Sequence, residues 1–297
     1  MNKATLTVFT PAYNRAHTLG RTYDSLCRQS CKDFEWLIID DGSTDNTHDL
    51  VNQWMLADNV FLIRYVYKEN GGLHTGYNKA IELMETELCV CIDSDDYMPD
   101  NAVEIIIETW KTKKNDEVAG IIGLDFLLDN TPMGGFFPNV EKCHGYDLVF
   151  KYHHICDVKY VARTELLKKV FPQPTFCGEK NFNPSYMYKK IDVEYKWIIL
   201  NENLCFVEYQ ADGMANGIYK QYLNSPNSFA AQRINNLSIP APVSFYLKQY
   251  IHLCSSAILS GDYLWMMKAP HPLFCMLLFP VGFFLSLYIR YRACSHK

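Results

Sequence analysis

Short apolar runs alternate with helical patterns over the first 110 residues, and this alternation constrains the fold more than any other feature. Four runs have the length of a strand and end in turn residues: 6–10, 34–39, 60–67 and 87–92. The segments between them place apolar side chains three or four positions apart, as in helices. Strands separated by helices favour a largely parallel sheet covered by helices. The sequence therefore predicts an α/β fold.

Polar residues follow the predicted strands at the points where the strands end. Thr10, Asp41, Asn70 and Asp93 each lie at or just past such an end. Ligands of parallel α/β sheets bind beyond the carboxyl ends of the strands. We therefore expect these side chains to converge on one rim that binds a ligand.

The fourth run ends in Asp93-Ser94-Asp95-Asp96. Carboxylates at the end of a buried strand are costly unless a cation neutralises them, and hard oxygen ligands suit Mn²⁺ or Mg²⁺. Side chains two apart in an extended chain point to the same side, so Asp93 and Asp95 could address one ion, with Asp95 as the direct ligand. The alternative is a solvated acidic turn before Pro99.

Three other segments contribute polar groups to the same rim. Tyr13, in the turn that follows the first strand, could offer an aromatic face to a nucleobase, or the segment could be only a turn. Asp41 could accept hydrogen bonds from a base or ribose. The segment Asn70-Gly-Gly-Leu-His74 begins a helix, where free backbone amides favour phosphate. His74 could reach that phosphate, or lie on the surface.

Together these segments resemble glycosyltransferase family 2, inverting enzymes with a GT-A (Rossmann-like) nucleotide-sugar fold. The matching motifs are Thr-Pro-Ala-Tyr-Asn-Arg (10–15), Ile-Asp-Asp-Gly-Ser-Thr-Asp (39–45), Asn-Gly-Gly-x-His-x-x-x-Asn (70–78) and Asp-Ser-Asp-Asp (93–96). The resemblance implies that Pro11, Tyr13 and Asp41 bind a uracil nucleoside. It also implies that Asp93 approaches the ribose and diphosphate, and that Asp95 holds Mn²⁺ or Mg²⁺.

The predicted site thus has two parts. The donor-binding residues are Thr10, Pro11, Ala12, Tyr13, Arg15, Asp41, Asn70, His74, Asn78, Asp93 and Ser94. The metal ligands are Asp95 and Asp93.

The catalytic base is the least determined part of the site. An inverting transfer needs a carboxylate that accepts the proton of the acceptor hydroxyl. Many relatives have a Glu near position 185, where this chain has Ser185, and serine cannot act as that base. Glu179 is the first candidate, with Asp192 and Asp212 as alternatives. A salt bridge with a loop cation such as Lys180 is the competing role for Glu179.

We predict two regions along the chain. Residues 1–235 would form the catalytic domain, with a nucleotide-sugar and metal half (1–118) and an acceptor half (119–235). Residues 236–297 would be a helical region with an uncharged segment, 272–289, that Pro280 and Gly282 interrupt and basic residues follow. That segment could lie on a membrane or re-enter it, span it, or be buried in the fold or in a homo-oligomer.

Charge and cysteine content exclude some functions. A net charge of −5 argues against a nucleic-acid-binding protein. Eleven cysteines without a regular spacing indicate reduced thiols in a cytosolic protein. A nucleotidyltransferase would carry a Gly- and Arg-rich loop near its start, and residues 11–15 are Pro-Ala-Tyr-Asn-Arg instead.

The predicted function is therefore an inverting, metal-dependent glycosyltransferase of the hexosyl or N-acetylhexosaminyl type. Its donor would be a nucleotide-diphosphate sugar, with UDP as the expected nucleotide. Its acceptor would be a saccharide or a polyprenyl-diphosphate-linked oligosaccharide of bacterial surface polysaccharide synthesis, at the cytoplasmic face of the inner membrane. The alternative is a catalytically silent subunit that binds a nucleotide-sugar or acts as a scaffold.

Overall fold

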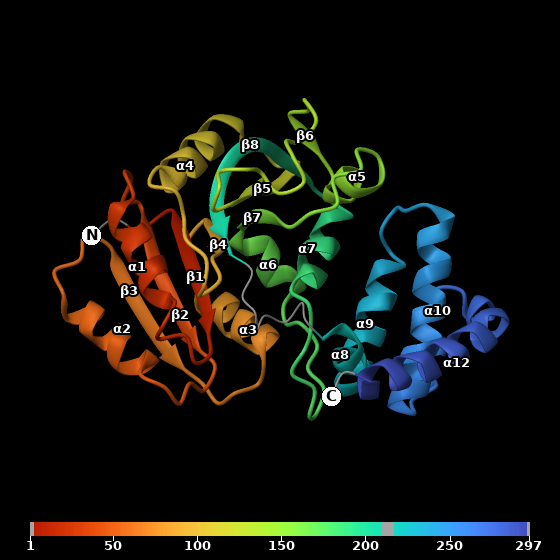
Figure 1. Ribbon diagram of the computed structural model, residues 1–297. Coiled ribbons are helices and arrows are strands. Elements are labelled where there is room, and N and C mark those ends of the chain that lie inside the picture. Colours follow the sequence, from red (N-terminus) through yellow and green to blue (C-terminus); the bar gives the residue numbers. More distant parts are fainter. Residues whose placement is uncertain (1–2, 209–216, 296–297) are drawn as a thin grey trace.

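The computed structural model describes residues 3–208 and 217–295, and one sheet of eight strands lies at the centre of this part of the chain (Figure 1). Its strand order is β3-β2-β1-β4-β7-β5-β8-β6. The first four strands of that order are parallel, β7 runs antiparallel to β4 and β5, and β5 pairs with β8 in parallel. The strands are β1 (Leu6–Ala12), β2 (Phe34–Asp40), β3 (Leu62–Tyr67), β4 (Leu88–Cys91), β5 (Val118–Leu127), β6 (Lys142–Cys143), β7 (Val158–Arg163) and β8 (Lys196–Val207).

Helices cover both faces of the sheet because alternate side chains of each strand point to opposite faces. In β1, Leu6 and Val8 pack into the cluster under one set of helices, whereas Phe9 packs into the cluster on the other face. The first face carries α1 (Leu19–Arg28), α2 (Thr47–Leu56) and α4 (Ala102–Lys113). The second carries α3 (Leu73–Leu83), α5 (Gly145–Phe150), α6 (Thr164–Val170) and α7 (Ser185–Asp192).

The C-terminal helices form a separate layer beside the sheet (Figure 1). This layer consists of α8 (Ile218–Asn224), α9 (Pro226–Asn236), α10 (Val243–Ser260), α11 (Leu264–Met267) and α12 (Pro272–Ser295). Its core joins Ala230 of α9, Leu253 of α10 and Cys275 of α12 to Phe182, which precedes α7. The boundary predicted at 235/236 therefore falls inside a shared core, and packing assigns α9 to the C-terminal layer.

Helix α12 is continuous, although the sequence predicted that Pro280 and Gly282 would interrupt it. Gly282 serves helix packing instead: a Cβ at that position would lie 2.4 Å from Cβ of Cys254 on α10. The face of α12 that contains Cys275, Gly282 and Ile289 is buried, and most of the remainder is apolar and exposed. By length and composition α12 could cross a membrane, and 22% of its most apolar 18-residue window is buried.

Candidate functional site

The rim of the site begins where β1 and β2 end side by side. The amide of Asp41 donates to the carbonyl of Ala12 at 2.8 Å, which extends the strand pairing by one step. The Asp41 carboxylate is buried and accepts hydrogen bonds from the amides of Gly71 (3.0 Å) and Gly72 (2.8 Å). Lys68 forms an ion pair with the same carboxylate. In this structure Asp41 thus holds the 70–72 loop at the start of α3.

The same loop is fixed from its other side by the segment that precedes α7. Nζ of Lys180 donates to Oδ1 of Asn70 at 2.5 Å. Gly72 adopts φ = +94°, and a Cβ there would lie 2.1 Å from the carbonyl oxygen of Lys180. Only glycine fits this close approach of two backbones.

Gly72→Ala is therefore expected to displace the 70–72 loop and to weaken binding of a nucleotide-sugar. Gly261→Ala is the matched control, because Gly261 also has a positive φ (+73°) but a Cβ added there would have no atom within 4 Å. Positive φ costs about 1–2 kcal/mol of stability for a non-glycine residue in both variants. Calorimetric titration with UDP would show weaker binding for Gly72→Ala alone; equal affinity in both variants would contradict the prediction.

The turn that follows β1 exposes its aromatic residue at the rim. The side chain of Tyr13 is 48% exposed, whereas Pro11 and Ala12 are buried beneath it. Asn14 adopts φ = 53°, and its Oδ1 accepts a hydrogen bond from the amide of Thr44 at 2.8 Å. The two predicted nucleoside-binding turns are thereby joined, with the ring of Tyr13 facing solvent.

The acidic turn after β4 is held in place by α1. Nη2 of Arg21 donates to the carbonyl oxygen of Asp95 at 2.9 Å, and Oγ1 of Thr22 donates to that of Asp96 at 2.7 Å. Burial and the neighbouring charge of Asp93 raise the pKa of Asp95. A cation placed beside such a carboxylate stabilises its charged form, which burial and the neighbouring negative charge otherwise disfavour.

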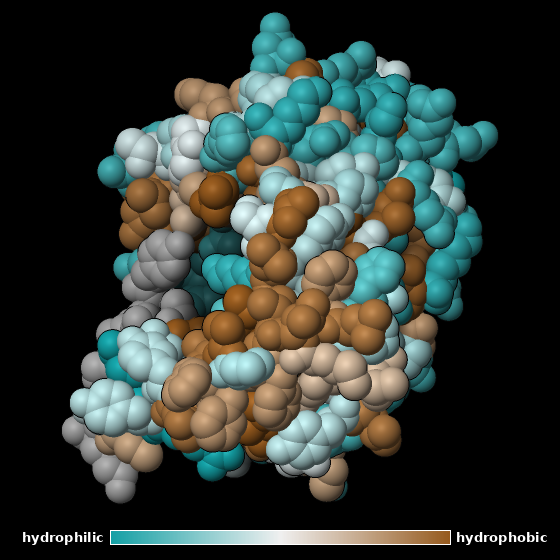
Figure 2. All heavy atoms as spheres, turned by 90° about the vertical axis from the view of Figure 1, so that its right-hand side faces the viewer, coloured by the Kyte–Doolittle hydropathy of each residue, from teal (hydrophilic) through white to brown (hydrophobic). Residues whose placement is uncertain are grey.

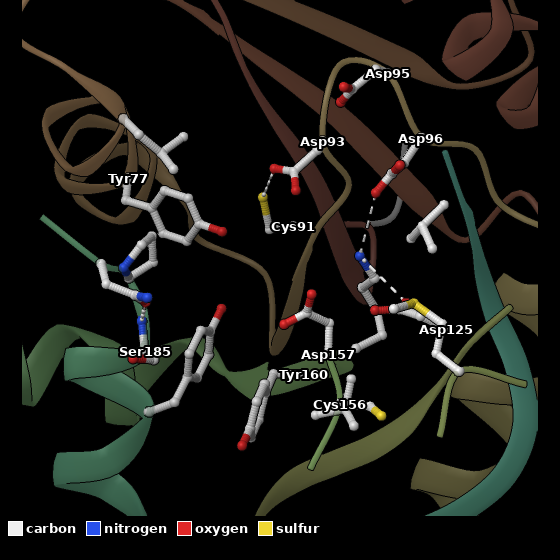
Figure 3. Close-up of a pocket in the computed structure, with 18 of the residues that line it drawn as sticks. Tyr77, Cys91, Asp93, Asp95, Asp96, Asp125, Cys156, Asp157, Tyr160 and Ser185 are labelled. Carbon is white, nitrogen blue, oxygen red and sulfur yellow. Dashed lines mark hydrogen bonds and ion pairs between the residues drawn. The ribbon is translucent and has the colours of Figure 1, made fainter. Parts of the chain in front are cut away.

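A pocket of about 820 Å³ lies below this turn. Asp93, Asp95 and Asp96 line it on one side, and the carboxylate of Asp157 faces them from the other (Figure 3). Tyr160 also lines the pocket, with its ring directed away from the acidic turn. The remaining wall comes from several elements and consists of Leu73, Tyr77, Cys91, Asp125, Met133, Cys156, Val158, Lys159, Asn181, Asn183, Pro184, Ser185, Tyr188, Val207, Glu208 and Gln221. The pocket thus joins the first half of the chain to the second.

A buried cation balances two of the carboxylates of this pocket. Nζ of Lys159 in β7 lies 3.5 Å from Oδ1 of Asp125 in β5 and 3.9 Å from Oδ2 of Asp96. Burial raises the pKa of Asp125 to about 6 and that of Asp96 to about 8, against the lowering effect of Lys159. The pKa of Lys159 is raised well above its usual value, because the neighbouring carboxylates outweigh its burial. These three residues form a charged cluster in the pocket wall.

Sequence reasoning missed this cluster and the residues on the β7 side of the pocket, among them Asp125, Asp157, Lys159 and Tyr160. A signal was present for two of them. Asp125 interrupts the apolar run of β5, and Lys159 stands in the largely apolar strand β7. Charged residues are rarely buried unless they are paired, so two opposite charges in buried strands indicate a pair.

The structure gives Glu179 a role that differs from the predicted one. Its carboxylate accepts hydrogen bonds from the amides of Asn227 (2.9 Å) and Ser228 (2.7 Å), at the first turn of α9. Both oxygens are therefore occupied, and Glu179 is absent from the pocket wall. A carboxylate at this place stabilises a helix N-terminus by satisfying its free amides. This geometry favours helix capping over catalysis.

The alternatives to Glu179 are not brought to the pocket either. The Asp192 carboxylate is buried and accepts from the amides of Gly145 and Tyr146 at the start of α5, and from Nε1 of Trp197 at 3.0 Å. It thus caps α5 and does not line the pocket. Asp212 lies outside the described residues.

Several predicted donor-binding residues have structural partners within the protein. The hydroxyl of Thr10 is buried and accepts from Nε1 of Trp36 at 3.0 Å, and Asn78 exchanges two hydrogen bonds with the backbone of Gln173. His74 is buried, which lowers its pKa, and its Nδ1 has no hydrogen-bond partner among the described residues. Ser94 is buried within the acidic turn, and Arg15 is partly exposed at the end of the Tyr13 turn.

Comparison with known proteins identifies the part of the chain that carries this rim. Residues 7–135 match the family model described as Glycosyl transferase family 2. Residues 7–135 are a glycosyltransferase family 2 domain. The chain is also similar to the chondroitin synthase of Pasteurella multocida (strain Pm70), with 35% identity over 109 residues, which cover 37% of this chain and 11% of that protein. The chain spans well under two thirds of the length of the first curated relatives that it matches.

Solved structures share the fold of this chain. S. aureus TarS 1-349 in complex with UDP-GlcNAc superimposes with a TM-score of 0.62 at 16% identity, over 87% of this chain and 73% of that chain. The mannosyltransferase PcManGT from Pyrobaculum calidifontis, in complex with GDP-Man and Mn²⁺, gives 0.58 at 18% identity, over 99% and 84%. The predicted GT-A architecture, with its mainly parallel sheet and C-terminal apolar helix, is confirmed.

Proposed function

We propose that this protein is an inverting, metal-dependent glycosyltransferase that uses a UDP-sugar. The observation that carries the proposal is the pocket whose upper wall is the acidic turn after β4 of a family 2 domain. The side chains of Asp93 and Asp95 face a space large enough for a sugar diphosphate, next to the rim formed by Tyr13 and the 70–72 loop.

The side chains of the acidic turn fit a divalent cation. Mn²⁺ and Mg²⁺ are typically held by one or two carboxylates and completed by substrate phosphates. Among residues 3–208 and 217–295 no three His, Cys, Asp or Glu side chains are already gathered as a metal centre. Two carboxylates beside a space for a diphosphate match this mode of ion binding, so we assign Asp95, with Asp93, as the metal ligands. When bound, the ion would offset charge on the departing nucleoside diphosphate.

The nucleoside would lie at the rim, with its base against the exposed ring of Tyr13. Asp41 is occupied by the 70–72 loop in this structure, so we assign it the role of holding that loop against the nucleotide. TarS has been crystallised with UDP-GlcNAc, which supports a uridine donor, and PcManGT was crystallised with GDP-Man and Mn²⁺, which supports the metal. The acceptor would be a saccharide hydroxyl of bacterial surface polysaccharide synthesis, and the similarity to a chondroitin synthase supports that class.

The release of UDP tests this proposal. The full chain would be incubated with UDP-glucose, UDP-galactose and UDP-N-acetylglucosamine in turn, with Mn²⁺, with Mg²⁺ or with EDTA. We expect at least one donor to release UDP in the presence of a metal and none in EDTA. Tight UDP binding without turnover for any donor and acceptor would favour a silent nucleotide-sugar-binding subunit. Equal release in EDTA would refute metal dependence.

The C-terminal layer supports a location at the cytoplasmic face of the inner membrane. Large apolar side chains of α10, α11 and α12 gather on one face of the molecule, beside a hollow in the surface (Figure 2). Helix α8 packs on α12, and its Gln221 lines the pocket. Exposed Arg290 follows the apolar part of α12 and suits anionic headgroups. We propose that α12 lies on the bilayer surface, where the pocket would meet a lipid-linked acceptor.

Replacing three exposed side chains of α12 is expected to weaken membrane binding about tenfold or more, because each contributes apolar area to the contact. The variant is Leu273→Ser with Leu277→Ser and Phe284→Ser, side chains that are 73%, 74% and 68% exposed. The control makes the same change to serine at three exposed apolar residues elsewhere: Leu56 in α2, Val60, and Leu62 in β3. Flotation with phosphatidylglycerol vesicles measures the binding. Equal flotation of the two variants would refute the membrane assignment.

A further inference from the structure

We infer that Asp157, in the loop before β7, is the catalytic base of the transfer; the inference rests on the function proposed above. Asp157 is exposed and lines the pocket from the side opposite the acidic turn. In Figure 3 its carboxylate points into the same space as that of Asp93. A group at this place would face the reacting sugar while the acidic turn holds the diphosphate.

The other carboxylates near the pocket are engaged elsewhere. Asp96 and Asp125 pair with Lys159, and Oε2 of Glu208 accepts from Nη1 of Arg21 at 2.6 Å. Glu179 and Asp192 cap helices outside the pocket wall. Only the two proposed metal ligands and Asp157 remain among the pocket carboxylates that the structure describes.

No cation or hydrogen-bond donor in the described part of the chain engages the carboxylate of Asp157. Its lone pairs are therefore available to a substrate hydroxyl. Ser185, at the start of α7, lines the same pocket and carries no acid–base group of suitable pKa. Asp157 would thus supply, from the loop before β7, the proton-accepting group that Ser185 cannot supply from α7.

The step balances with these groups alone. The acceptor oxygen forms a bond to the anomeric carbon as its proton passes to the carboxylate of Asp157. The bond between the anomeric carbon and the diphosphate oxygen breaks, and its electron pair leaves with UDP. Attack from the face opposite the leaving group inverts the anomeric centre, and protonated Asp157 returns its proton to solvent after product release.

Asp157→Asn removes the base at nearly constant size. With the UDP-sugar and metal that give UDP release in the wild type, and with water as the acceptor, we expect kcat to fall about 10²–10⁴-fold. The KM for the donor and the affinity for Mn²⁺, measured by electron paramagnetic resonance, should stay at wild-type values. Asp157→Glu, which keeps a carboxylate at this position, should restore part of kcat.

Asp116→Asn is the matched control, because Asp116 is an exposed loop residue outside the pocket. A kcat for Asp157→Asn within threefold of the control, in an enzyme that does release UDP, would overturn the base assignment and leave the proposed function intact. Loss of turnover in Asp212→Asn but not in Asp157→Asn would also overturn the base assignment and leave the proposed function intact. If the wild type releases UDP from none of the donors tested, both the base assignment and the proposed function are overturned.

Discussion

Asp95→Asn is expected to reduce metal-dependent UDP release by about 10²–10³-fold. An amide at this position keeps the size of the side chain but removes the charge that would hold Mn²⁺ against the diphosphate. The expected loss corresponds to several kcal/mol of transition-state stabilisation. Titration with Mn²⁺, followed by electron paramagnetic resonance and by UDP release, measures affinity and rate on the same samples.

Asp24→Asn is a suitable control for Asp95→Asn, since Asp24 is an exposed residue of α1, the helix that holds the acidic turn. It should bind Mn²⁺ and turn over as the wild type does. The melting temperature of Asp95→Asn should not fall, because burial and Asp93 already disfavour its charged form. Wild-type Mn²⁺ affinity in Asp95→Asn would show that the ion, if bound, is held by other residues.

Lys159→Met is expected to destabilise the protein by about 3–5 kcal/mol at pH 8, the cost of removing one partner from a buried charged cluster. Methionine fills a similar volume but leaves Asp96 and Asp125 without their cation. Urea unfolding in EDTA measures the free energy of unfolding without a bound metal. Lys111→Met, on the exposed face of α4, should change it by less than about 0.5 kcal/mol.

The destabilisation by Lys159→Met should shrink as the pH is lowered. The pKa values of Asp125 (about 6) and Asp96 (about 8) exceed the ordinary value of 3.8. Between pH 3.8 and the raised pKa of each group, the folded protein therefore binds more protons than the unfolded chain. Stability linked to these groups is therefore present at low pH and lost as the pH rises toward 8. Without Lys159 the loss is larger, so the two proteins should differ less at pH 5 than at pH 8. A pH-independent difference would mean that lost packing dominates.

The rim of the site was predictable because it follows from local sequence. Each strand of the β3-β2-β1-β4 half ends in a short polar segment, and parallel pairing brings those ends together whatever the rest of the chain does. The structure places Asp41 and Asn70 together in one hydrogen-bonded rim and Asp93 in the pocket wall, while their binding roles stay predictions. The α/β architecture was predictable for the same reason, since strand and helix periods alternate clearly up to α4.

The second half depends on contacts between distant residues, which local patterns do not reveal. The sequence favours Glu179 as the catalytic base, but its oxygens reach amides 48 and 49 residues away at the start of α9. Asp157 has no motif around it and is distinguished only by the wall on which it lies. The role of Gly282 likewise involves a distant partner, because it lies against Cys254 of α10.

The segment 179–182 has a consequence for how the molecule responds to a substitution. Glu179 caps α9, Lys180 contacts Asn70, Asn181 donates to Gln221 of α8, and Phe182 lies in the core of the C-terminal layer. Four consecutive residues thus connect the loop at the nucleotide rim to the helices that carry the apolar face. The same four residues contact both regions, so a substitution that displaces this segment would disturb the 70–72 loop and the packing of the C-terminal helices together.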